Sequence, residues 1–113
     1  MAQSYTLNKI YELAGDDKEF IADLVNAFLE EIPKDLGYLE SAVKSEKPKI
    51  AYEYAHKMKP SFQMFSVNVM NELKVFEFWS EGHATDEEVK LALFTLLERA
   101  NKALSQIRND FKK

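Results

Sequence analysis

The sequence predicts an all-α protein, an antiparallel four-helix bundle with a short extra helix at its N-terminus. Three observations support this prediction. The 113 residues include only three glycines and three prolines, whereas an all-β domain needs many turns. Apolar residues recur at spacings of three and four along most of the chain, which is the period of a helix with one buried face. The length suits one domain, covering residues 1–113.

Composition narrows the class of protein further. Hydrophobic residues make up 46% and charged residues 30% of the chain, which is typical of a folded globular domain. The absence of cysteine excludes disulfides, thiol catalysis and cysteine-bound zinc. The net charge of −4 argues against nucleic acid or an anionic membrane as the main partner. No apolar run is long enough to span a membrane and no signal-peptide core is visible, so we expect a cytoplasmic protein.

The N-terminal region predicts a short helix followed by a capped helix start. Residues 7–14 place their apolar side chains on one face, and Gly15 ends that helix. Asp16 is followed three residues later by Glu19, which is the aspartate form of a capping box. We therefore expect the second helix to begin at Asp17.

The second predicted helix is long and contains a proline. Its apolar stripe passes Pro33 without a change of phase, although a proline inside a helix removes one hydrogen bond. We expect one long kinked helix, with a break at Ile32 as the alternative. The stripe consists of Phe20, Ile21, Leu24, Phe28, Ile32, Leu36, Leu39 and Val43.

Three further helices follow. Pro48 suits the first position of a helix, where its missing N–H is not needed. Ser66 is a candidate N-cap for the fourth helix, and Thr85 with Glu88 forms a capping box for the last one. The third helix has the apolar stripe Ala51, Tyr54, Ala55, Met58, Phe62 and Phe65. The last has Val89, Leu93, Leu96, Leu97, Ala100, Leu104, Ile107 and Phe111.

The two histidines differ in their expected surroundings. His83 follows Gly82 in a loop and is expected on an inert part of the surface. His56 lies in the middle of the third helix, roughly 150° from the centre of its apolar stripe. We therefore expect His56 to face solvent, which by itself is compatible with an ordinary surface histidine.

The residues around His56 resemble the active-site helix of histidine-containing phosphotransfer (HPt) domains. That family has the pattern Ala-His-x-Leu-Lys-Gly-Ser, and Ala55, His56, Lys59 and Ser61 match it, with Met58 in place of leucine. The likeness extends upstream, where Gly15 to Phe20 and then Phe28, Pro33 and Leu39 resemble the family's long second helix.

The resemblance implies a phosphocarrier and not an enzyme. His56 would take a phosphoryl group from the aspartate of a response-regulator receiver domain, or from a hybrid histidine kinase, and pass it on. Lys59 lies on the same side of the helix and would neutralise a phosphoryl oxygen. The contacts expected with the partner are Tyr52, Lys57, Pro60 and Gln63. The domain would need no cofactor or metal, because the magnesium ion belongs to the receiver.

Two departures from the family pattern leave an alternative open. Pro60 and Ser66 stand at positions where the family has glycine. Proline at residue 60 lacks the N–H that would bond to the carbonyl of His56, so the backbone at the acceptor should be altered. The alternative function is an HPt-like binding module that docks a receiver or a histidine kinase without being phosphorylated.

A metal-binding bundle is a third possibility. Glu53 and His56 form a Glu-x-x-His pair, as in di-iron carboxylate bundles. Both side chains are expected to point outward, and the chain lacks a second such pair, so no metal site is predicted. Nucleophile elbows, phosphate loops and dinucleotide-binding fingerprints are also absent from the sequence.

Overall fold

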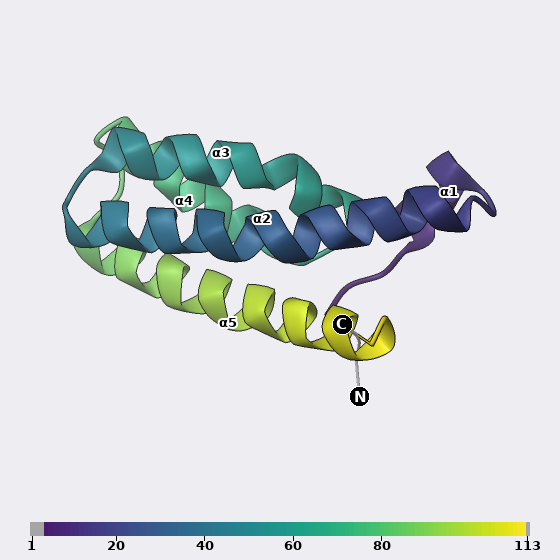
Figure 1. Ribbon diagram of the computed structural model, residues 1–113. Helices are drawn as coiled ribbons and strands as arrows, with labels where there is room; N and C mark the ends of the chain where they lie inside the picture. The colour runs from purple at the N-terminus through teal and green to yellow at the C-terminus, as the bar shows by residue number, and fades with distance from the viewer. Residues whose placement is uncertain (1–3, 113) are drawn as a thin grey trace.

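The computed structural model describes residues 4–112, and all regular secondary structure in that range is helical. The helices are α1 (Asn8–Ala14), α2 (Lys18–Lys44), α3 (Pro48–Met64), α4 (Met70–Ser80) and α5 (Asp86–Asp110). The prediction of an all-α protein is therefore confirmed. Helix α2 packs against α3 and α5, helix α4 packs against the same two helices, and the short α1 packs on one end of α2 (Figure 1).

The core is formed by the apolar stripes of the four longer helices. Its aromatic centre contains Phe28 of α2, Phe62 of α3 and Phe65, which directly follows α3. The ring of Phe28 lies edge-on to Phe62 at 6.0 Å between centroids and 4.2 Å from Phe65. These contacts fix the rotation of α3 about its own axis, so the residues on its opposite face are presented to solvent.

The start of α2 differs by one residue from the prediction. Asp17, and not Asp16, is the N-cap, and its side chain accepts a hydrogen bond from the backbone N–H of Phe20 at 3.0 Å. Glu19 consequently falls one position too early to complete a capping box. Phe20, which is expected in the buried stripe, is 44% exposed, because it projects about 100° away from the mean direction of the buried residues of α2.

The remaining helix boundaries largely follow the sequence. Helix α2 continues through Pro33, so the alternative of a break at Ile32 is wrong. Pro48 occupies the first turn of α3. Thr85 and Glu88 form the predicted capping box, with both reciprocal hydrogen bonds present at 3.1 and 2.8 Å. Among residues 4–112, no helix has the length and apolar character needed to cross a membrane.

Ser66 ends α3 and does not cap α4, contrary to the prediction. Its φ angle is +55°, in the left-handed region. The N–H of Ser66 bonds to the carbonyl of Gln63 at 3.1 Å, and the N–H of Val67 bonds to that of Phe62 at 2.9 Å. This is the hydrogen-bond pattern of a Schellman motif. Helix α4 begins only at Met70, without a side-chain cap, because residues 67–69 first complete the turn between the two helices.

Candidate functional site

His56 lies near the middle of α3 with its side chain on the exposed face. Its neighbours Ala55 and Met58 are each 1% exposed and point into the core. The histidine is therefore attached to a rigid, well-packed helix while its imidazole remains accessible, as the apolar stripe predicts.

A shallow groove of about 210 Å³ runs between α3 and α4 beside this histidine. The wall contributed by α3 consists of Tyr52, Ala55, His56, Lys59 and Gln63, and the wall contributed by α4 consists of Met70, Asn71, Leu73, Lys74 and Glu77. Four of the six site residues expected from the sequence thus lie together on one wall. They are Tyr52, His56, Lys59 and Gln63.

The four residues follow one another along the helix. Their spacings of four, three and four residues place them on one side of α3, one above the next. The ring of Tyr52 lies 5.7 Å from the imidazole of His56, with 40° between the ring planes. Tyr52 is half-buried, so it restricts the positions that the His56 ring can adopt on the side toward the start of α3.

Lys57 and Pro60 do not line the groove. The ammonium Nζ of Lys57 donates a hydrogen bond to Oδ1 of Asp35 on α2 at 3.1 Å. Among the described residues, Asp35 is the charged side chain that is buried, at 4% exposure. This hydrogen bond raises the pKa of Lys57. Lys57 therefore ties α3 to α2, and Pro60 lies exposed outside the groove lining.

The α4 wall carries polar residues that the sequence did not indicate as part of a site. Asn71, Lys74 and Glu77 are spaced by three residues and share one side of the helix. Lys74 supplies a second cation to the groove that contains His56 and Lys59. The polar stripe on α4 is visible in the sequence, but the helix that it faces is known only from the packing of α4 on α3.

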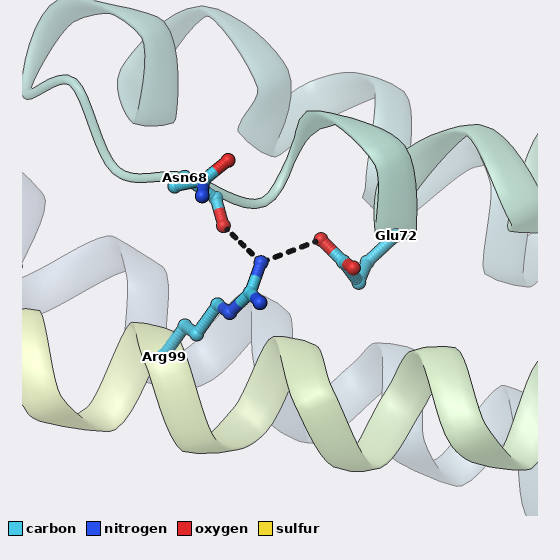
Figure 2. A network of polar contacts seen from close by, with 3 residues as sticks. All are labelled: Asn68, Glu72 and Arg99. Carbon is cyan, nitrogen blue, oxygen red and sulfur yellow. Dashed lines mark hydrogen bonds and ion pairs between the residues drawn. The ribbon is translucent and has the colours of Figure 1, made fainter.

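Helix α4 is held in place by a polar contact on the side of α5 (Figure 2). Nη1 of Arg99 on α5 donates to the carbonyl oxygen of Asn68 at 3.0 Å and pairs with Oε1 of Glu72 at 3.5 Å. Asn68 lies in the α3–α4 connection and Glu72 in the first turn of α4. This contact fastens the beginning of α4, and with it the wall of the groove that carries Lys74.

The groove is suited to binding an anion beside an imidazole. Two lysine side chains from different helices border it, and both are exposed. Its volume is below the roughly 300–1,000 Å³ of a typical small-molecule pocket. Within residues 4–112, no three potential metal-ligating side chains gather at one place. Glu53 and His56 are both exposed, as expected for a pair that does not point into a bundle core.

No family model matches the chain, and no match is found among curated proteins or solved structures. The HPt resemblance is therefore carried by the residues of the third helix and by the apolar and proline pattern of the second. What can be proposed about function depends on the groove and its side chains.

Proposed function

We propose that this chain is a histidine phosphotransfer protein of a two-component phosphorelay. In this proposal α2 to α5 form an antiparallel four-helix bundle of the HPt type, with α1 as a short additional helix, in the cytoplasm. His56 carries the phosphoryl group between receiver-domain aspartates. The observation that supports this function best is the exposed imidazole of His56 beside Lys59, with Lys74 on the facing wall of the same groove.

The proposed reaction moves one phosphoryl group from an acyl phosphate to an imidazole. A neutral ring nitrogen of His56 attacks phosphorus, the N–P bond forms and the P–O bond to the receiver aspartate breaks. The aspartate leaves as a carboxylate. The phosphorylated ring is at first an imidazolium, and it loses its remaining N–H proton to solvent, which leaves a neutral ring that carries the negatively charged phosphoryl group. The reverse reaction then transfers the phosphoryl group from His56 to the aspartate of a second receiver.

Lys59 and Lys74 have complementary roles in this proposal. The phosphoryl group carries negative charge on its three outer oxygens, and ammonium groups stabilise such charge at close range. Lys59 approaches from the helix that bears His56, whereas Lys74 approaches from α4. In this proposal both ammonium groups would stabilise a phosphoryl group on His56, and neither is engaged in an ion pair within residues 4–112.

A binding module without phosphotransfer is the second candidate, and Pro60 is the observation that favours it. The missing N–H at Pro60 lies one turn after His56, so the carbonyl of His56 loses its usual helical partner. Because Pro60 does not line the groove, its ring leaves open the side of the imidazole that faces α4. We therefore favour the carrier function.

Label transfer from a phosphorylated receiver tests the proposal. The chain should acquire acid-labile, base-stable phosphate and then lose it to a second, unphosphorylated receiver. His56→Gln should abolish the transfer, and His83→Gln, the matched control, should leave it intact. If the chain binds the receiver but acquires no label, the binding-module function replaces the carrier function.

A further inference from the structure

The outward face of α5 carries an apolar pair that the proposed function does not use. Leu91 and Phe94 are 67% and 65% exposed. They lie three residues apart and therefore on the same side of the helix. Helix α5 packs against α2 and α4 through its opposite face. Side chains this large and apolar, placed together, are typical of a contact surface.

Charged residues surround this apolar pair in an ordered way. Glu87, Lys90, Glu98 and Lys102 are all exposed, and with the apolar pair they project within about 60° of one direction. None of the four takes part in an ion pair within the described chain. We name these six residues the α5 face. Its apolar pair is thus surrounded by two acidic and two basic side chains.

We propose that the α5 face is a site of self-association, and that a second copy of this chain binds it in the antiparallel direction. A two-fold interface requires a surface that is complementary to itself, so that each residue meets the same partner in both copies. An antiparallel pairing with the two-fold axis at Phe94 satisfies this requirement. It places the two Phe94 rings against each other and one Leu91 on each side of them.

The charges of the α5 face match in the same arrangement. Lys90 precedes Phe94 by four residues and Glu98 follows it by four, so in the proposed dimer both lie about 6 Å from the axis along the helix and at the same level across the interface. Glu87 lies seven residues before Phe94 and Lys102 eight residues after it. Their distances from the two-fold axis, measured along the helix, therefore differ by one residue, about 1.5 Å. Two copies would form each of these two ion pairs twice.

The dimer leaves the His56 groove open. Helix α3 packs on α2 and α4 from the side of the molecule opposite to α5 (Figure 1). Both grooves of a dimer would face outward, and each could bind its own partner. Because a single helix face buries a small area, the association is weak, with a dissociation constant on the order of 0.1–1 mM. The proposal does not depend on the proposed function.

Sedimentation equilibrium of the whole chain over a dilution series to millimolar concentration tests the proposal. We expect a monomer–dimer equilibrium in which Phe94→Lys raises the dissociation constant at least about tenfold. Leu13→Lys is the matched control, because Leu13 is a 68% exposed leucine on α1, and it should leave the constant unchanged. A chain that remains monomeric at millimolar concentration, or a dimer that tolerates Phe94→Lys, would overturn the proposal.

Charge exchange tests the antiparallel arrangement separately. Glu87→Lys and Lys102→Glu should each weaken the dimer about threefold, and the double variant should restore it. The double variant has the net charge of the natural chain, so restoration reports on the pair and not on overall repulsion. If the double variant is weaker than both single variants, Glu87 does not meet Lys102 and the proposed interface is wrong. Circular dichroism verifies that every variant folds.

Discussion

Replacing Ser66 by glycine should stabilise the protein. Ser66 adopts the left-handed conformation, with φ at +55°, and this conformation costs a residue with a Cβ atom about 1–2 kcal/mol. Glycine avoids that cost but loses more conformational entropy on folding, about 0.5–1 kcal/mol. The difference is a net stabilisation of about 0.5–1 kcal/mol. Within residues 4–112, no side-chain hydrogen bond of Ser66 offsets it.

Thermal and urea denaturation measure this effect. For a chain of 113 residues, the expected gain raises Tm by about 2–4 °C. Ser66→Ala is the control, because alanine retains the Cβ atom, and it should change stability by less than about 0.5 kcal/mol. Glu46→Gly is a second test of the same effect, since Glu46 ends α2 with φ at +54°. If Ser66→Gly is neutral while Glu46→Gly stabilises, the backbone strain assigned to residue 66 is wrong.

Further predictions concern the groove and its surroundings. Lys59→Ala and Lys74→Ala should each slow phosphotransfer to His56 several-fold in single-turnover assays without unfolding the domain; unchanged kinetics would remove that lysine from the site. Pro60→Gly should raise the transfer rate, because it restores the N–H facing the carbonyl of His56; an unchanged or lower rate would contradict this. The hydrogen bond to the buried carboxylate of Asp35 raises the pKa of Lys57 above its usual value of 10.5. The ion pair therefore stabilises the fold fully below pH 10.5. This contribution is lost as the pH rises through the raised pKa. Lys57→Met should therefore lower stability at neutral pH, and urea denaturation should show a smaller deficit above pH 10.5; a deficit independent of pH would rule out the ion pair as its source.

Periodicity in the sequence was sufficient to orient the third helix. Ala51, Ala55, Met58 and Phe62 are all buried, and this alone directs His56 outward. The same reasoning could not place Lys74 beside it, because a neighbour on another helix depends on how two helices pack. A local pattern gives the faces of a helix, whereas a groove is a property of a pair of helices.

The errors in the prediction have local physical causes. Two adjacent aspartates precede α2, and the sequence does not show which of them reaches the free backbone N–H; Asp17 does. Serine is a residue type that is common at N-caps, but Ser66 has a left-handed backbone conformation and ends the preceding helix. Asp35 is buried beside the apolar stripe of α2, which is possible because Lys57 approaches from α3, a long-range contact that no spacing rule predicts.

Competition between the two histidines for a small phosphoryl donor tests the central claim most directly. Incubation with phosphoramidate, followed by ³¹P NMR and peptide mapping, compares them within one molecule. The groove of His56 contains two lysines and one carboxylate, that of Glu77, so its charged side chains are positive in sum. Nδ1 of His83 instead lies 4.0 Å from the carboxylate of Glu81, which would repel a phosphoryl group. We predict that phosphate accumulates on His56 several-fold faster than on His83, and that His56→Gln removes the faster signal. Equal rates at both histidines, or a faster rate at His83, would contradict the assignment of His56 as the phosphoryl acceptor.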